Sequence, residues 1–235
     1  MSEFRLRWHV YSDLDQLIEA AANGIESESA RAISTAGKFL IVLAGGSTPR
    51  PIYARLVELD TPWNQWHIYF GDERCLSIGH LERNDTMVHE VWLNKVPIPI
   101  DQIHAVPAEL GPDAGANRYA HELAGLGPFD MTILGLGVDG HTASLFPGGP
   151  LGCLRGAPDV LAVHAAPKPP ASRVSMSAAR LTRSQSVQLI VTGAEKRATL
   201  TRLRDGADMP IRSVIPANGI DLFFDVSASP TGVLD

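Results

Sequence analysis

One pattern recurs along the chain: a short, continuously apolar run, a turn containing glycine, and then a segment with helical spacing. The clearest case is FLIVLA at 39–44, which is followed by GGSTP and by apolar residues at three- and four-residue steps up to Leu59. Apolar runs without polar alternation are typical of strands that are covered on both faces of a parallel sheet. The alternation therefore predicts an α/β, Rossmann-like fold, in which a mostly parallel sheet is flanked by helices on both faces.

The remaining elements follow from the same periodicities. We expect helices at 12–35, at 84–92 and at 194–205, with Ser12 and Asn84 as the N-caps of the first two and Gly37 ending the first. Further strands are expected at 66–73, 129–137, 160–165, 187–193 and 219–226. Apolar strands resume directly after the segments 146–158 and 166–170, which are rich in proline and glycine. These segments are therefore predicted as surface loops, and residues 1–235 as a single domain.

Composition and charge exclude several classes of function. A chain of 235 residues with 45% hydrophobic residues can bury a substantial core, and its formal net charge of -6 argues against a general nucleic-acid or anionic-membrane surface. The N-terminal residues MSEFRLRWHV contain no continuous apolar stretch, so we expect no signal peptide or membrane span and a cytoplasmic location. The two cysteines, Cys75 and Cys153, lack metal-ligand spacing, so neither a disulfide framework nor a metal is expected.

The turn GGSTP follows the first buried strand. Gly45 and Gly46 let the backbone approach a ligand, Ser47 and Thr48 add hydroxyl groups, and the next helix begins with unpaired N–H groups. These groups suit a phosphate. The chain has no GxxxxGK[ST] motif, so a nucleoside triphosphate is not expected. For this turn taken alone, a helix cap without any ligand is the alternative interpretation.

A second motif, GLGVDG at 135–140, matches the GxGxxG pattern of dinucleotide-binding proteins. That pattern normally runs directly into a long helix, whereas here it runs into HTASLFPGGP. We therefore reject a dinucleotide site and expect no cofactor. The strand end instead presents Asp139 and His141, and a carboxylate two residues from an imidazole can orient the ring for general-base work. A purely structural histidine is the alternative.

Charged residues also occur at the carboxyl ends of two other predicted strands. GDER at 71–74 offers the carboxylates of Asp72 and Glu73, either of which can act on protons, and the guanidinium of Arg74, which can bind a phosphate or stabilise an oxyanion. VTGAEK places Lys196 in the first turn of a helix, and Arg173 adds a further cation. Taken alone, GDER has a surface ion-pair group as its alternative interpretation, and Lys196 and Arg173 have a solvated surface charge as theirs. Because the loops at the carboxyl ends of strands gather the binding groups in such folds, we expect these clusters to form one site.

Together these motifs resemble those of the 6-phosphogluconolactonases. LAGGSTPRPIYARL, GDER followed by RND, GLGVDGHTASLFPG, PKPPASRVSMS and VTGAEK occur in the order and approximate spacing of that family, from about residue 40 to the C-terminus. DGHTASLFP is the most specific piece. GGSTP and DGH are shared with the related glucosamine-6-phosphate deaminases, which continue differently after DGH. The loop CLSIGHLERND departs from the valine-proline and serine-asparagine usual in lactonases.

The resemblance implies hydrolysis of 6-phospho-D-glucono-1,5-lactone to 6-phosphogluconate in the oxidative pentose phosphate pathway, without a metal, a cofactor or a covalent intermediate. His141 is expected to act as the general base, with Asp139 holding its ring. We place Arg74 near the lactone carbonyl, with Asp72 positioning it or a sugar hydroxyl, and leave open that Arg74 contacts the phosphate. The phosphate is expected at Gly45, Gly46, Ser47, Thr48, Arg173 and Lys196.

Two alternative functions are carried alongside the lactonase. A deaminase needs a second acid/base set, and HTASLFPGG lacks the acidic residue that deaminases carry after their histidine. A sugar-phosphate sensor needs only the phosphate turn, and it gives no reason for Asp72, Asp139 and His141 to occur together. The expected partner is thus a small sugar-phosphate lactone, with no nucleic acid and no membrane. The oligomeric state is left open and is compatible with a monomer.

Overall fold

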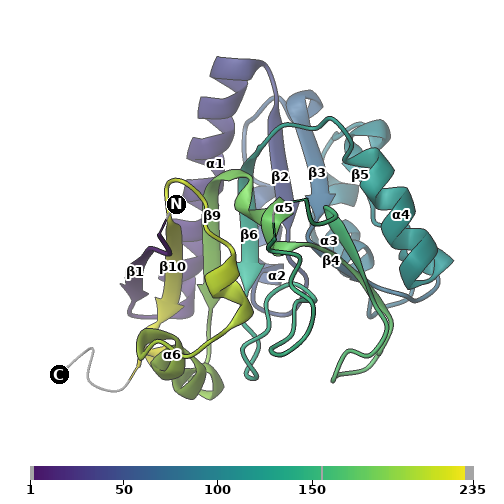
Figure 1. The fold of residues 1–235 in the computed structure, drawn as a ribbon. Helices are drawn as coiled ribbons and strands as arrows, with labels where there is room; N and C mark the ends of the chain where they lie inside the picture. The colour runs from purple at the N-terminus through teal and green to yellow at the C-terminus, as the bar shows by residue number, and fades with distance from the viewer. Residues whose placement is uncertain (1–2, 155, 231–235) are drawn as a thin grey trace.

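The computed structural model describes residues 3–154 and 156–230 (Figure 1). The other residues of the predicted domain, 1–2, 155 and 231–235, lie outside the described residues. Within the described part, the main sheet has seven strands, all paired in parallel, in the order β1-β10-β9-β6-β2-β3-β5. Its strands are β1 Leu6–Tyr11, β2 Phe39–Leu43, β3 Trp66–Phe70, β5 Ile103–His104, β6 Phe129–Gly135, β9 Ser184–Val191 and β10 Ile220–Asp225.

Helices lie on both sides of this sheet (Figure 1), so the α/β, Rossmann-like prediction is confirmed. They are α1 Leu14–Ala36, α2 Arg50–Leu56, α3 Asn84–Val91, α4 Pro112–Glu122, α5 Ala178–Thr182 and α6 Arg197–Arg204. Strand β2 is buried along its whole length, as its unbroken apolar sequence predicts. In the described residues, no helix combines the length and the apolar character needed to cross a membrane.

A smaller antiparallel sheet packs beside the main one, in the order β4-β8-β7. Its strands are β4 Asp72–Arg74, β7 Val160–Val163 and β8 Arg173–Met176. This corrects two predictions: the strand expected at 66–73 is divided at Gly71, and the strand expected at 160–165 does not join the parallel sheet. Gly71 joins the two sheets. Its N–H donates to the carbonyl of Leu43 in β2, and its carbonyl accepts the N–H of Met176 in β8.

Both predicted N-caps are wrong. The N-cap of α1 is Asp13, whose carboxylate accepts the N–H of Gln16 at 2.9 Å, while Gly37 ends the helix with φ +72° as predicted. At α3 the N-cap position is Arg83, which makes no side-chain cap. The missing acceptor comes from another element, because the Glu73 carboxylate accepts the first N–H groups of this helix. Sequence spacing cannot reveal a cap supplied from a separate strand.

The order of the strands fixes the position of the site. The chain leaves β2 toward β3 on one side, and it leaves β6 toward β9 on the other, while β2 and β6 are themselves neighbours. Loops that leave adjacent parallel strands in opposite directions open a crevice at the carboxyl edge of the sheet. The loops after β2, β3, β6 and β9 all meet there.

Candidate active site

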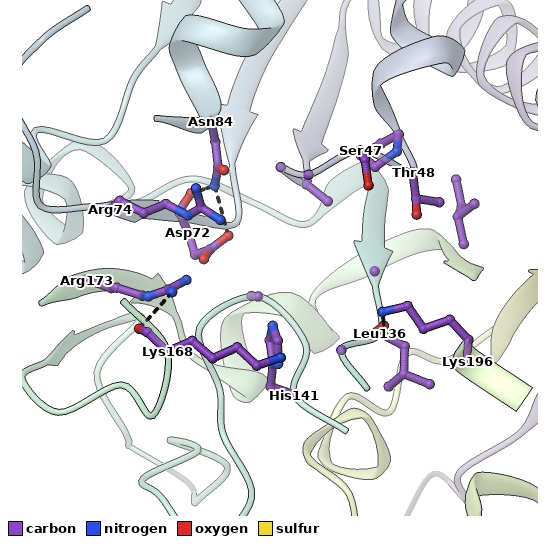
Figure 2. Close-up of a pocket in the computed structure, with 18 residues that line it drawn as sticks. Ser47, Thr48, Asp72, Arg74, Asn84, Leu136, His141, Lys168, Arg173 and Lys196 are labelled. Atoms are coloured by element: carbon purple, nitrogen blue, oxygen red, sulfur yellow. Dashed lines mark hydrogen bonds between the residues drawn. The ribbon is translucent and has the colours of Figure 1, made fainter. Parts of the chain in front are cut away.

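A cavity of about 210 Å³ lies at this carboxyl edge (Figure 2). Four loops that follow neighbouring strands of the main sheet contribute to its wall, together with β4, β8 and the segment before β8. Its polar lining includes Gly45, Gly46, Ser47, Thr48, Asp72, Arg74, Asn84, His141, Lys168, Arg173 and Lys196. The structure therefore brings together residues that are up to about 150 positions apart in the chain.

The glycine turn after β2 forms one wall of the cavity. Gly45 has no room for a side chain, because a Cβ there would lie 1.8 Å from Oδ1 of Asn84. Gly46 has φ +102°, a conformation that favours glycine. Helix α2 has only seven residues, so its dipole is weaker than a long helix would supply. The exposed backbone and the hydroxyls of Ser47 and Thr48 are thus the main groups of this turn that are available to a ligand.

His141 and Asp139 form a hydrogen-bonded pair beyond the end of β6. The Nδ1 of His141 lies 2.5 Å from Oδ1 of Asp139. A tight turn makes this contact, since Gly137 N–H donates to the His141 carbonyl and Gly140 has φ +97°. A Cβ at Gly137 would lie 2.1 Å from His141 Nδ1, so glycine is required there. With Nδ1 bonded to Asp139, Nε2 is the ring nitrogen left for a reacting molecule.

The surroundings of His141 keep its imidazole neutral. Burial is the largest influence and lowers its pKa below the ordinary value of 6.5, and the charge of Lys168 lowers it further. The hydrogen bond and charge of Asp139, with the charge of Asp72, act in the opposite direction but do not reverse the shift. For Asp139, burial raises the pKa, yet His141 and Lys168 together bring it below its usual value. At neutral pH the pair is thus a neutral imidazole and an ionised carboxylate.

Asp72 is buried in the opposite wall, where two side chains hold its carboxylate. Ser144 Oγ donates to Oδ2 at 2.5 Å, and Asn84 Nδ2 approaches Oδ1 at 3.2 Å while donating to the Asp72 carbonyl at 2.8 Å. The expected pairing of Asp72 with Arg74 is thus not the contact that fixes this carboxylate. Arg74 instead donates from Nη1 to the carbonyl of Glu82.

Arg173 lies opposite Arg74 in the register of β4 and β8. Its Nε donates to the Pro170 carbonyl at 3.1 Å, and its Nη2 donates to the carbonyls of Lys168 and Pro169, both at 3.2 Å. The guanidinium therefore holds the loop before its own strand. Burial lowers the pKa of Arg173 from its ordinary value, although Asp72 opposes this shift.

Lys196 lies at the far side of the cavity, near Ser47 and Thr48 (Figure 2). Its Nζ donates to the carbonyl of Leu136 at 2.9 Å, and burial lowers its pKa. Lys196 ends a 3-10 turn directly before α6 rather than standing in the first turn of that helix. With Lys168, Arg74 and Arg173, it gives the cavity four cationic side chains, so the site is locally positive although the whole chain is acidic.

Nine of the ten residues predicted for the site line this one cavity, and the tenth, Asp139, lies directly behind His141. Arg173 and Lys196 do not share a position within it, since Figure 2 shows them on opposite sides. Two of the polar side chains that line the cavity were not predicted, those of Asn84 and Lys168. A lysine between prolines in PKPP, close to the predicted Arg173, was the available signal for Lys168. Among the described residues, no group of three or more His, Cys, Asp or Glu is arranged to hold a metal ion.

A parallel α/β sheet with a histidine–aspartate pair and a cationic cavity at its switch point defines an enzyme that acts on a small anionic substrate. The particular family follows from comparison with known proteins. The family described as glucosamine-6-phosphate isomerases/6-phosphogluconolactonase matches residues 12–223, and the chain belongs to this family.

Individual relatives show where the chain lies within the family. A 6-phosphogluconolactonase of Synechocystis is 35% identical over 225 residues, which cover 90% of this chain and 92% of that protein. The crystal structure of 6-phosphogluconolactonase from Thermotoga maritima matches with a TM-score of 0.86 and 26% identity, covering 94% of this chain and all of that one. A monomeric glucosamine-6-phosphate deaminase shares the fold at 18% identity and a TM-score of 0.79, over 94% of this chain and 98% of its own. The fold alone therefore does not separate the two activities.

Proposed function

We propose that this protein hydrolyses 6-phospho-D-glucono-1,5-lactone to 6-phosphogluconate, in the oxidative pentose phosphate pathway. The observation that carries the proposal is the neutral His141, bonded through Nδ1 to Asp139 and set in a cavity with four cations. A phosphorylated lactone needs this combination, because one end is a dianion and the other is an ester that an activated water can attack. The relatives named above as 6-phosphogluconolactonases support the same substrate.

His141 is the general base of the proposed reaction. The water oxygen attacks the lactone carbonyl carbon while its proton passes to Nε2, and the carbonyl oxygen becomes an oxyanion. When that intermediate collapses, the bond from the carbonyl carbon to the ring oxygen breaks, and the imidazolium returns the proton to the ring oxygen. Asp139 holds Nδ1–H and stabilises the transient positive charge on the ring. A base of this kind contributes about a hundredfold to ten-thousandfold.

The phosphate is proposed to bind at the glycine turn. The exposed turn offers backbone N–H groups with the hydroxyls of Ser47 and Thr48, and Lys196 lies on the same side of the cavity (Figure 2). We revise the expected part of Arg173, because its guanidinium lies on the other side and is bonded to three loop carbonyls.

The sugar end is proposed to extend toward Asp72 and Arg74. The Asp72 carboxylate is fixed by Ser144 and Asn84, so it is ready to accept a hydrogen bond from a sugar hydroxyl. Arg74 is placed beside it, where its guanidinium can reach a hydroxyl or the lactone carbonyl. We also propose a cytosolic location, which cell fractionation tests.

The purified protein is expected to convert freshly made 6-phosphogluconolactone to 6-phosphogluconate faster than the spontaneous reaction does. The 6-phosphogluconate is measured by coupling to 6-phosphogluconate dehydrogenase. His141→Ala should lose most of kcat, with circular dichroism and melting temperature unchanged. No ammonia should be released from glucosamine 6-phosphate.

Each alternative function gives a different result in these assays. Ammonia release at turnover rates, without lactone hydrolysis, would identify a deaminase. Tight binding of sugar phosphate with neither activity would identify a sensor. A folded His141→Ala protein with wild-type turnover would remove the general-base assignment while leaving the lactonase activity in place.

A further inference from the structure

Lys168 lies beside the histidine–aspartate pair. Its Nζ is 3.3 Å from Oδ1 of Asp139, and the same oxygen lies 2.5 Å from Nδ1 of His141. One carboxylate oxygen therefore holds both a lysine and the proposed base. Figure 2 shows the Lys168 side chain running along the cavity wall and ending next to the His141 ring. Its side chain is 41% exposed and lines the cavity, so a ligand can reach it.

The loop that carries Lys168 is fixed from behind. Prolines flank the lysine on both sides, which restricts the backbone. Arg173 donates hydrogen bonds to the carbonyls of Lys168, Pro169 and Pro170, and its guanidinium lies 5.7 Å from the centre of the Phe146 ring. The centre of the Phe146 ring lies 4.8 Å from the centre of the His141 ring. Arg173 and Phe146 thus form the support that sets Lys168 and His141 at a defined spacing.

Two side chains are placed to meet negative charge at the lactone carbonyl, and they lie on opposite walls. Arg74 stands beside Asp72, away from His141 (Figure 2), and it donates to the carbonyl of Glu82. Lys168 stands on the same wall as His141. In the proposed reaction the attacking water lies between Nε2 and the carbonyl carbon, so the lactone group is placed at the wall that carries the base, and Lys168 is the cation on that wall. Lys168 is therefore better placed than Arg74 to meet the charge on the carbonyl oxygen.

We propose that Lys168 is a further catalytic residue, which donates a hydrogen bond from its ammonium group to the lactone carbonyl oxygen while His141 takes the proton from water. This role rests on the proposed lactone hydrolysis. In the attack step the carbonyl π electrons move to the oxygen, and the ammonium group stabilises the oxyanion without transferring a proton. Asp139 holds the lysine and the imidazole together before the substrate enters.

The electrostatics of the site agree with this role. The charged groups that act on His141 are Asp139, Lys168 and Asp72, and of these only Lys168 lowers its pKa. Removing the lysine should therefore raise the pKa of His141 toward its ordinary value. That shift reports the charge of Lys168 beside the ring, whereas kcat reports its action on the lactone oxyanion.

Lys168→Met should lower kcat by about tenfold to a hundredfold, with KM changed by less than about threefold, since it removes an interaction made mainly in the transition state. The acidic limb of the pH profile of kcat/KM should move to higher pH. Lys168→Arg should recover part of kcat.

Two controls accompany these measurements. The substrate phosphate titrates equally for Lys168→Met and wild type, so the shift of the acidic limb is taken as the difference between the two proteins. Lys95→Met, an exposed lysine outside the cavity, should leave all of these values unchanged.

The proposal is overturned if folded Lys168→Met keeps kcat within about twofold of wild type, or if the acidic limb does not move. It is also overturned if KM alone rises, because the lysine would then bind the phosphate. If Lys168→Met does not fold, Lys168→Gln provides the same comparison with a polar side chain. In each case, lactone hydrolysis by the wild-type protein shows that the proposed function stands independently of this result.

Discussion

At the level of single residues, the two cations predicted to share one phosphate have different surroundings. Lys196 makes one hydrogen bond, to the Leu136 carbonyl, whereas Arg173 makes three to the loop that carries Lys168. Lys196→Ala should raise KM for 6-phosphogluconolactone by about tenfold to a hundredfold, the cost of losing a charge-assisted bond, and should leave residual hydrolysis of unphosphorylated gluconolactone nearly unchanged. Steady-state kinetics on both lactones measures the difference.

Arg173→Met is the matched comparison for that experiment. Because this guanidinium holds the Lys168 loop, its loss should lower kcat on both lactones, and the effect should not depend on the phosphate. Equal losses on the two substrates in Lys196→Ala would show that Lys196 does not read the phosphate. A loss confined to the phosphorylated lactone in Arg173→Met would return Arg173 to the phosphate site.

Among the elements, β4 and α3 are joined by one buried carboxylate. Glu73 is fully buried; Oε1 accepts the N–H groups of Arg74 and Asn84, both at 2.8 Å, and Oε2 accepts that of Asp85 at 2.9 Å. Burial and the neighbouring Asp85 raise its pKa to about 7 from 4.5. The folded protein therefore binds a proton between these two values that the unfolded chain does not bind. This contribution to stability is fully present below pH 4.5 and is lost as the pH rises through about 7.

Glu73→Gln removes this titration. The difference in melting temperature, wild type minus variant, should increase as the pH is lowered from 8 to 5.5. Thermal unfolding followed by circular dichroism at several pH values measures this difference. Glu58→Gln, at an exposed position, is the control and should show no comparable trend. A wild-type advantage that is constant with pH, or that grows toward pH 8, would contradict the raised pKa of Glu73.

For the whole molecule, the sequence predicted the parallel α/β fold and most of the polar residues that line the cavity, because both depend on local signals. Apolar runs such as FLIVL predict buried strands, and glycine turns after them predict loops at one edge. What it could not predict depends on contacts between distant segments. The small sheet pairs Asp72 with Ser175 and Arg74 with Arg173, and Lys168 lies in the loop that leads into β8. Strand β8 has four residues, too few for a periodic pattern to identify it.

The same long-range contacts lead us to propose that the two sheets unfold as one domain. Met176 of β8 is fully buried in the hydrophobic core that also contains the main strands, and its N–H donates to Gly71 between the sheets. Met176→Ala should lower the free energy of unfolding by about 2 to 5 kcal/mol, the usual cost of such a cavity. The four tryptophans, Trp8, Trp63, Trp66 and Trp92, all lie outside the small sheet. Their fluorescence therefore reports on the main sheet and its helices.

If the chain is a single cooperative unit, urea unfolding should show one transition, and the Met176→Ala midpoint should fall equally in tryptophan fluorescence and in far-ultraviolet circular dichroism. This coupling is expected because the cavity has walls from both sheets, so a small sheet that opened alone would separate Asp72 and Arg74 from His141. Lactonase activity should be lost over the same urea range. Two resolved transitions, or a Met176→Ala midpoint that moves in circular dichroism while fluorescence stays at the wild-type value, would instead divide the chain into separately folding parts.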